Sequence, residues 1–438
     1  MNHIAIFDIG KTNKKAFVFD EDYRIVFEQT IQLPETADDD GYPCEDISLL
    51  QNWLLETARA LLHYPDFNIK AFNCTAYGAS FVHLDTNGQP VAPIYNYLKP
   101  FPEALKNRFL EKYGPAEKIC LETASPWLGH LNSGLQLYWL KHTKPFIFNK
   151  IHTSLHLPQW LARLLTGAFQ PSTVHPVRPD RPGGRQPSTV TEMTSLGCHT
   201  MLWDFRKNDY HDWVKAEGIV EKFPPIVRPE TAVQPTGLHD SSAALIPYMA
   251  CFREPFVLIS TGTWCISLNP FNDEPLTAAE LARDCLCYLT PAGKPVKAAR
   301  YFGGHEHDEA VKKIATDYGV PPEFYKIPTP ANDGGNFMDI QNALDAYTGF
   351  MRELVARQVA STRLAIGQSP VRRIFVDGGF SKNELYMRLL AAAFPEMEVF
   401  AAELAQATAL GAALAVREEW NEKEAWQPTL PLHLFQWK

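Results

Sequence analysis

A short stretch near the start of the chain limits the possible folds most strongly. Residues Ile4 to Asp20 predict two alternating apolar strands joined by a tight turn, which is the pattern of a β-hairpin. Asp8 stands where the first strand ends, and the turn beside it is rich in small, polar and basic residues: Gly10, Lys11, Thr12, Asn13, Lys14 and Lys15. Backbone N–H groups and cations beside a carboxylate suit a nucleotide triphosphate with Mg²⁺. An ordinary solvated hairpin tip has the same composition, so this stretch alone leaves both interpretations open.

Related stretches recur in the second half of the chain. Residues Phe256 to Leu268 predict another hairpin, around the small-residue turn Ser260 to Thr263. Residues Arg373 to Phe394 predict a strand that ends at the pair Gly378-Gly379 and enters a helix. A capping box of the S-x-x-E type predicts that this helix starts at Ser381. A glycine pair at such a corner lets a flat ligand approach the backbone, and the helix start favours anions.

Taken together and in this order, the motifs resemble those of a known family, the FGGY carbohydrate kinases of the actin, hexokinase and Hsp70-like ATPase superfamily. The resemblance extends from Ile4 to about Val416 and is carried by five stretches: DIGKTN at 8–13, GLHDS at 237–241, STGTW at 260–264, DGGFSKN at 377–383 and ATALGAA at 407–413. The H-D-[ST] form is most similar to the L-rhamnulose and L-fuculose kinase branch. The fold that this resemblance implies is α/β, with two actin-like (ribonuclease H-like, ASKHA) ATPase domains around a central cleft.

The resemblance also implies a role for each motif. The two turns would hold the phosphates of ATP and the glycine corner would hold the adenosine, which makes the nucleotide-binding candidates Gly10, Lys11, Thr12, Asn13, Lys14, Thr261, Gly262, Thr263, Gly378, Gly379 and Asn383. The cofactors implied are ATP and Mg²⁺. The carboxylates expected to hold Mg²⁺, the first of them through water, are Asp8 and Asp240.

Asp240 is also interpreted as the catalytic base. Transfer of a γ-phosphoryl group to a sugar hydroxyl needs a group that takes the proton from that hydroxyl. Asp240 lies between the two phosphate motifs, as the corresponding aspartate does in the family. A simpler alternative stays open, because D-S-S-A-A is also a good helix start in which the aspartate serves only as a cap.

Contacts to the sugar are carried over from the same resemblance. The candidates are Tyr77, Gly78, His239, Asp240, Ser241 and Arg300. Trp127 and His130 are further candidates, and for these, as for the strand-end pair at 77–78, ordinary packing is an open alternative. Two departures stand out: Ser80, where rhamnulose kinases tend to carry an acid, and residues 95–99, where many members have a W-x-D-x-R run. The lost charges leave open a substrate other than L-rhamnulose.

Histidines and cysteines outside these motifs are interpreted as structural. The run His305-Glu306-His307-Asp308 is dense in metal ligands, but its two histidines would face different sides of a helix. His199 and Trp203 are assigned to packing. Eight cysteines without CxxC spacing predict buried free thiols in a reducing cytosol.

Length and charge exclude several other classes. A chain of 438 residues suits two domains, which we place at 1–240 and 245–420, followed by a packed tail at 421–438. A net charge of −9 argues against nucleic acid as a partner. The absence of a basic N-terminus and of long apolar runs predicts a cytoplasmic protein without signal peptide or membrane span. The motif QPSTV occurs twice within 170–190 and brackets a Pro/Arg-rich segment, which predicts an exposed loop.

The sequence therefore predicts an ATP-dependent phosphotransferase that phosphorylates a ketose or deoxyketose such as L-rhamnulose or L-fuculose. Its partners would be ATP and a small sugar, and a homodimer is a further hypothesis. Two other classes stay open: an actin/Hsp70-like ATPase switch and a catalytically silent sugar-binding relative. The intact pair at 239–240 counts against the switch. The unusual Lys11 and the lost charges near Ser80 and Tyr97 favour the silent relative.

Overall fold

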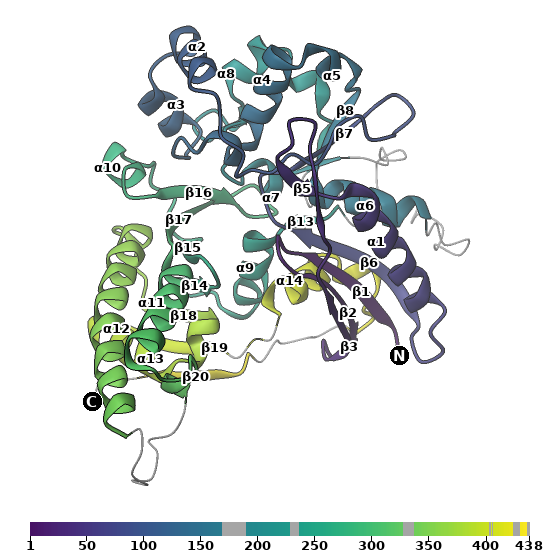
Figure 1. Ribbon diagram of the computed structural model, residues 1–438. Helices are drawn as coiled ribbons and strands as arrows, with labels where there is room; N and C mark the ends of the chain where they lie inside the picture. Colours follow the sequence, from purple (N-terminus) through teal and green to yellow (C-terminus); the bar gives the residue numbers. More distant parts are fainter. Residues whose placement is uncertain are drawn as a thin grey trace.

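The computed structural model describes residues 1–168, 190–227, 236–326, 337–402, 404, 406–423 and 430–435. It arranges the chain around two large sheets (Figure 1). The first sheet has the strand order β13-β6-β1-β2-β3, formed by β1 (His3–Ile9), β2 (Lys14–Asp20), β3 (Ile25–Ile31), β6 (Ile69–Ala76) and β13 (Leu238–His239). Strands β1 and β2 form the predicted antiparallel hairpin, whereas β6 pairs in parallel with both β1 and β13. The parallel strands end at the same edge, which positions the site described below.

Both faces of the first sheet are buried, as expected for a sheet with parallel crossovers. Ala5 and Phe7 of β1 pack on one face against α1 (Ile47–Leu62) and α6 (Leu157–Ala168). Ile4 and Ile6 point to the other face and pack against α14 (Ala407–Ala415). A small hairpin of β4 (Glu35–Ala37) and β5 (Pro43–Glu45) leads from β3 into α1.

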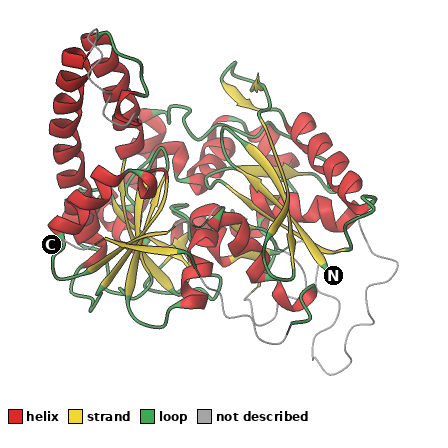
Figure 2. Ribbon diagram, turned by 90° about the horizontal axis from the view of Figure 1, so that it is seen from below, coloured by secondary structure: helices red, strands yellow, loops and turns green. Residues whose placement is uncertain are grey.

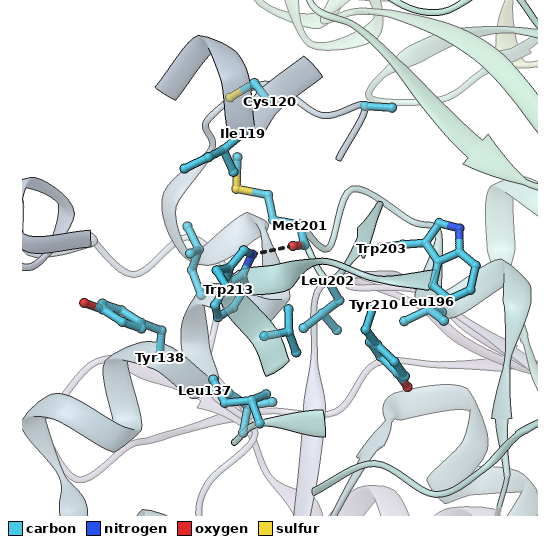
Figure 3. Packing of buried hydrophobic residues seen from close by; sticks show 14 of the residues in the cluster. Ile119, Cys120, Leu137, Tyr138, Leu196, Met201, Leu202, Trp203, Tyr210 and Trp213 are labelled. Atoms are coloured by element: carbon cyan, nitrogen blue, oxygen red, sulfur yellow. Dashed lines mark hydrogen bonds between the residues drawn. The ribbon is translucent and has the colours of Figure 1, made fainter. Parts of the chain in front are cut away.

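Between β6 and β13 the chain builds a mostly helical region, drawn at the top of Figure 1. Its elements are β7 (Phe81–Leu84), α2 (Glu103–Tyr113), α3 (Ala116–Glu122), η1 (Gly129–Leu131), α4 (Ser133–Thr143), α5 (Pro145–Lys150), β8 (Thr153–His156), β9 (Thr191–Glu192), α7 (Met193–Leu196), β10 (Trp203–Asp204), β11 (Asp209–Tyr210), α8 (Asp212–Ala216), η2 (Val220–Lys222) and β12 (Ile226–Val227). Trp213 lies in its core, where the indole Nε1 donates to the carbonyl of Met201 at 2.9 Å (Figure 3). Helix α4 is buried on all sides over residues 133–140.

The second half forms a seven-stranded sheet of order β16-β17-β15-β14-β18-β19-β20. Its strands are β14 (Phe256–Thr261), β15 (Cys265–Asn269), β16 (Cys285–Leu289), β17 (Pro295–Tyr301), β18 (Arg373–Gly378), β19 (Glu398–Ala402) and β20 (Leu432–Phe435). The helical elements are α10 (Ala278–Leu281), α11 (Gly303–Tyr318), η4 (Phe324–Lys326), α12 (Phe337–Ile366), η5 (Gly379–Lys382), α13 (Glu384–Ala393) and η6 (Arg417–Glu419). Figure 2 shows the two sheets side by side, each with helices packed against it. The predicted two-domain α/β architecture is confirmed.

Two helices join the halves. In α9 (Asp240–Cys251), Leu245 and Tyr248 pack on the second sheet, while Ala409 and Leu410 of α14 pack on the first. The two helices lie so close that a Cβ added to Gly411 would fall 1.9 Å from the carbonyl oxygen of Ala243. This is the close helix packing expected from the small residues of 407–413. It also means that α14, assigned to the second domain by the prediction, contacts the first sheet.

The remaining predictions about the chain ends and surfaces can be compared directly. Strand β20 lies within the predicted tail and extends the second sheet by pairing with β19. The duplicated segment at 170–190 lies outside the described residues, except for Val190. All eight cysteines are described and are free thiols, as predicted. Among the helices that the structure describes, none combines the length and apolarity that a membrane span requires.

Candidate active site at the junction of the two halves

Three parallel strands of the first sheet bring two carboxylates together. Asp8 of β1 lies opposite Thr75 of β6, and Asp240 directly follows β13. Thr75 Oγ1 donates a hydrogen bond to Asp8 Oδ1 at 2.8 Å. Burial raises the pKa of Asp8 to about 6, and the nearby charge of Asp240 adds to this increase. The two carboxylates expected to hold a metal ion therefore lie close enough to repel one another.

Asp240 is the first residue of α9, and His239 before it occupies the N-cap position. Asp240 Oδ1 accepts from Ser241 N at 2.6 Å and from Ser241 Oγ at 3.2 Å, and lies 3.2 Å from His239 Nε2. Asp240 therefore satisfies one N–H group of the first turn of α9, and this contact is compatible both with a capping role and with a role as base. Burial raises the pKa of its carboxyl to about 6, although 33 % of the side chain is exposed.

The turn between β1 and β2 is closed by its own backbone, since Gly10 N donates to the carbonyl of Asn13 at 2.9 Å. Thr12 and Asn13 are exposed at its tip. Lys14 is buried and forms an ion pair with Glu45 Oε1 at 2.9 Å, while Lys11 pairs with Glu35 at 2.5 Å. The position of Lys14 therefore does not support its predicted role in binding phosphate.

Lys15 lies on the opposite side of the strand from Lys14. The β1–β2 register places Lys15 directly across from Asp8, so both side chains share one face of the hairpin. Its Nζ donates to Gln406 Oε1 at 3.1 Å, and its charge opposes the upward shift of the Asp8 pKa. The basic residue beside the carboxylates is thus one position later than the sequence analysis placed it.

The corresponding turn in the second half is built differently. Thr261 at the end of β14 is buried, and its Oγ1 donates to the carbonyl of Asp377 at 2.5 Å and accepts from Phe380 N at 3.0 Å. A Cβ on Gly378 would lie 1.9 Å from the carbonyl oxygen of Thr261. The side chain of Thr261 therefore ties the two loops together, and Gly262 and Thr263 remain exposed beyond it.

Several of the predicted sugar contacts gather beside Asp240. Gly78 follows β6, and a Cβ there would lie 2.3 Å from Cys198 Sγ and 3.1 Å from His239 Nε2. Tyr77 is buried, with its ring centroid 5.9 Å from that of Tyr97. Burial raises the pKa of Tyr97, and Asp240 is the largest electrostatic contributor to that increase. The structure therefore places an aromatic pair and a close backbone approach next to the proposed base.

Arg300 reaches the same region from β17 of the second half. Its guanidinium binds Asp284, with Nη2 2.7 Å from Oδ1, and stacks over Trp264 at 5.1 Å. Its positive charge acts to lower the pKa of Cys198 and of His199. Trp127 and His130 belong instead to the packed helical region, where the His130 ring is edge-on to Phe101 at 5.1 Å.

Comparison with known proteins agrees with this geometry. The N-terminal domain of the FGGY family of carbohydrate kinases matches residues 3–237, and the FGGY carbohydrate kinase C-terminal domain matches residues 253–425. The chain belongs to the FGGY family of carbohydrate kinases. It is thus a phosphotransferase with an alcohol group as acceptor.

Individual FGGY relatives are distant in sequence. A curated rhamnulokinase from Oceanobacillus iheyensis is 21 % identical over 379 residues, which cover 76 % of this chain and 75 % of the relative. A carbohydrate kinase from Novosphingobium aromaticivorans has a similar structure, with a TM-score of 0.76 and 24 % identity over 99 % of this chain and 94 % of that one. A xylulose kinase from Lactobacillus acidophilus has a TM-score of 0.75 and 16 % identity, covering 96 % and 89 %. These structures establish the fold of the FGGY chain.

The adenosine motif of this FGGY chain departs from the predicted local structure. Helix α13 begins at Glu384, with Asn383 as its N-cap, because Asn383 Oδ1 accepts from Tyr386 N at 3.0 Å. The capping box at Ser381 is therefore wrong: a 3₁₀ turn at 379–382 comes first, and Ser381 Oγ donates to the carbonyl of Gly378. Asn383 Nδ2 donates to Tyr347 at 2.7 Å, so its side chain is already engaged within the protein.

Two residues near Asp240 of this FGGY chain were missed or assigned only to packing. Cys198 was not singled out, and His199 was interpreted as structural, yet both lie against His239. They follow α7 in the helical region, about forty residues before His239. The dipeptide itself carries no recognisable signal, because only the tertiary contact brings it to the base.

Proposed function

We propose that this FGGY kinase transfers the γ-phosphoryl group of ATP to a hydroxyl of a ketose or deoxyketose, with Asp240 as the base. The observation that carries the proposal is the pair of interacting carboxylates, Asp8 and Asp240, at the end of the first sheet. Across the junction, the second half offers exposed backbone at Gly262 and Thr263. Phosphoryl transfer uses negatively charged groups on one side of the reacting phosphate and backbone groups on the other.

Asp240 would take the proton from the attacking hydroxyl. A pKa of about 6 leaves the carboxylate ionised at neutral pH and still basic enough to accept a proton as the oxygen–phosphorus bond forms. Ser241 fixes the carboxylate through two hydrogen bonds to one oxygen. Lys15, on the face of Asp8, is positioned to neutralise charge on the phosphates.

The paired carboxylates also fit a hard divalent cation. Asp8 and Asp240 each have a raised pKa because each is buried, and Asp8 also feels the charge of Asp240. Mg²⁺ prefers one or two carboxylates together with water and substrate phosphates, so Asp8 would hold it with Asp240 nearby. When bound, the ion would offset the negative charge that develops on the phosphoryl group.

The substrate class rests on the relatives and on the residues around Asp240. The matched relatives include a rhamnulokinase and a xylulose kinase, both named for ketoses. In this chain Tyr97 lies beside Asp240, and the buried Ser80 Oγ has no hydrogen-bond partner among the described residues. A deoxyketose such as L-rhamnulose or L-fuculose would place an apolar methyl group against the Tyr77–Tyr97 pair.

The test is sugar-stimulated release of ADP from Mg-ATP, measured on the full chain with a panel of L- and D-ketoses, deoxyketoses and polyols. We expect one or a few ketoses to stimulate release. Asp240→Asn should retain nucleotide binding and lose roughly 10²-fold or more in turnover, the usual scale for removal of a general base.

Asp85→Asn is the matched control, because Asp85 Oδ1 only accepts from backbone N–H groups of its own turn and an asparagine oxygen can do the same. Hydrolysis of ATP without any sugar would indicate an ATPase switch instead. Nucleotide binding without hydrolysis would indicate a silent sugar-binding relative. Near-normal turnover of Asp240→Asn would remove the assignment of the base.

A further inference from the structure

A cluster of metal-binding side chains lies next to the proposed base and has no role in the mechanism above. Cys198, His199 and His239 each offer one ligand atom, and these atoms lie within 4.8 Å of one another. All three side chains are more than nine-tenths buried. Two come from the loop after α7 and the third from β13, so the fold brings them together from distant parts of the sequence.

The hydrogen bonds of His199 fix its ring in the form that binds metals. His199 Nδ1 lies 3.0 Å from the carbonyl oxygen of Leu131, which can only accept, so Nδ1 carries the proton. The lone pair is then on Nε2, which lies 3.3 Å from Cys198 Sγ. A backbone carbonyl that holds the far nitrogen of a ligating histidine is a recurring feature of metal sites.

His239 has a possible partner on each ring nitrogen. Ser242 Oγ, which donates to the carbonyl of Leu289 at 3.1 Å, lies 3.4 Å from His239 Nδ1 and can accept from it. On the other side, Nε2 lies 3.2 Å from Asp240 Oδ1, which can only accept. Without a metal ion Nε2 can donate to Asp240; with the proton on Nδ1 instead, the lone pair of Nε2 is available to a cation.

The surroundings suit a cation that binds sulfur and nitrogen. Around Cys198, the negative charges of Asp240 and Glu192 are opposed by the guanidinium of Arg300, which is itself paired with Asp284. The absence of a side chain at Gly78 lets the backbone approach the thiol of Cys198, since any Cβ there would collide with Cys198 Sγ.

We propose that Cys198, His199 and His239 bind one thiophilic divalent cation of the zinc class, at a site separate from the Mg²⁺ position at Asp8. One thiolate and two imidazoles leave a fourth position open, as in catalytic rather than structural zinc sites. Binding forms the metal–sulfur bond and releases the thiol proton of Cys198 to solvent. The bound ion occupies Nε2 of His239, a predicted sugar contact, and places a positive charge beside Asp240, and so inhibits the kinase; this second part rests on the proposed function.

Binding is tested with Co²⁺ on the metal-free full chain, without sugar or ATP. We expect one equivalent to produce a near-ultraviolet thiolate-to-cobalt charge-transfer band, which Zn²⁺ then abolishes by competition. Loss of an outer-shell partner costs about 10–100-fold in affinity, so loss of a ligand in Cys198→Ser should remove the band and weaken binding by at least about 10²-fold. His199→Gln should weaken binding on the same scale.

The matched control is Cys287→Ser, a buried thiol of β16 whose electrostatic neighbours are Lys297 and Glu280. This variant should retain the band. Circular dichroism of each variant establishes that it is folded. A band that persists in folded Cys198→Ser, or no band in the wild type, would overturn the site.

The inhibitory part is tested separately by titrating Zn²⁺ into the sugar-dependent ADP assay at fixed excess Mg²⁺. The wild type should lose activity over the same Zn²⁺ range in which cobalt is displaced, and Cys198→Ser should need at least about 10²-fold more Zn²⁺ relative to its own activity. Equal sensitivity of both proteins would contradict inhibition through this site. If no sugar supports activity, the proposed function fails, while the cobalt spectrum still decides whether the site exists.

Discussion

The two halves of the molecule share one strand plan but use it for different chemistry. In the first sheet the strands run β13-β6-β1-β2-β3, and in the second the order β19-β18-β14-β15-β17 repeats the same sequence of parallel and antiparallel pairings. In the first half, carboxylates lie at the ends of two parallel strands: Asp8 in β1 and Asp240 directly after β13. In the second half, the parallel strands β14 and β18 end at Thr261 and Gly378. One backbone arrangement therefore supports ionic chemistry on one side and close backbone approach on the other.

The two turns show the same contrast in how they are held. Ion pairs of Lys11 and Lys14 with glutamates stabilise the first turn. Hydrogen bonds of the Thr261 hydroxyl to the adjoining loop stabilise the second. Substitutions should therefore act through buried charge in the first half and through steric fit in the second.

The largest effect should come from Lys14. Replacing Lys14 by Met leaves Glu45 buried with only the more distant Lys11, and breaking a buried pair in this way costs about 3 kcal/mol of folding stability. Urea unfolding followed by circular dichroism measures this loss. Lys15→Met is the matched variant: it should unfold normally but bind ATP more weakly. A stable Lys14→Met that fails to bind ATP would restore Lys14 as a phosphate ligand.

In the second half, the sharpest steric test is Gly378. Its φ of +88° and the close carbonyl of Thr261 leave no room for a side chain, so Gly378→Ala should cost about 1–3 kcal/mol of stability and weaken ADP binding. Thermal unfolding and calorimetric titration with ADP measure the two effects. Gly379→Ala should unfold like the wild type, because nothing lies within 4 Å of its Cβ position. A loss of ADP affinity in that variant would then report contact with the nucleotide itself.

The smallest predicted effect concerns pH. Because the base must be ionised and its pKa is raised to about 6, kcat/KM for the sugar should be constant above that value. Below it, with Mg²⁺ saturating so that Asp8 stays ionised, kcat/KM should fall by about tenfold for each pH unit. Asp377 in the second half has a similarly raised pKa, so Asp377→Asn serves as the control and should retain the same acidic limb. If kcat/KM stayed constant down to pH 5, or if its decrease at low pH disappeared in Asp377→Asn, the titrating group would not be Asp240.

Local patterns were enough to predict much of this molecule. Alternating apolar residues located β1, β2, β14 and β15, and the order of motifs identified the family and singled out Asp240. The face of Lys15 also follows from local pairing, because a turn closed between Gly10 and Asn13 sets Lys15 opposite Asp8. The sequence analysis chose Lys11 and Lys14 as phosphate ligands without considering that side chains alternate between the two faces of a strand, and so left out Lys15.

Other features depend on contacts between distant residues. The packing of α14 on the first sheet joins residues such as Ala412 and Asn73, linked by a 2.8 Å hydrogen bond. The meeting of Cys198 with His239 is of the same kind. Helix α13 is capped by Asn383 rather than by Ser381, because Ser381 belongs to the 3₁₀ turn at 379–382 that precedes the helix.

The close contact between α9 and α14 has a mechanical consequence. The halves touch where Gly411 meets the backbone of Ala243, and again where Cys287 N donates to the carbonyl of Ala124 at 2.9 Å. A larger side chain at residue 411 would therefore force α9 and α14 apart and change the angle between the halves.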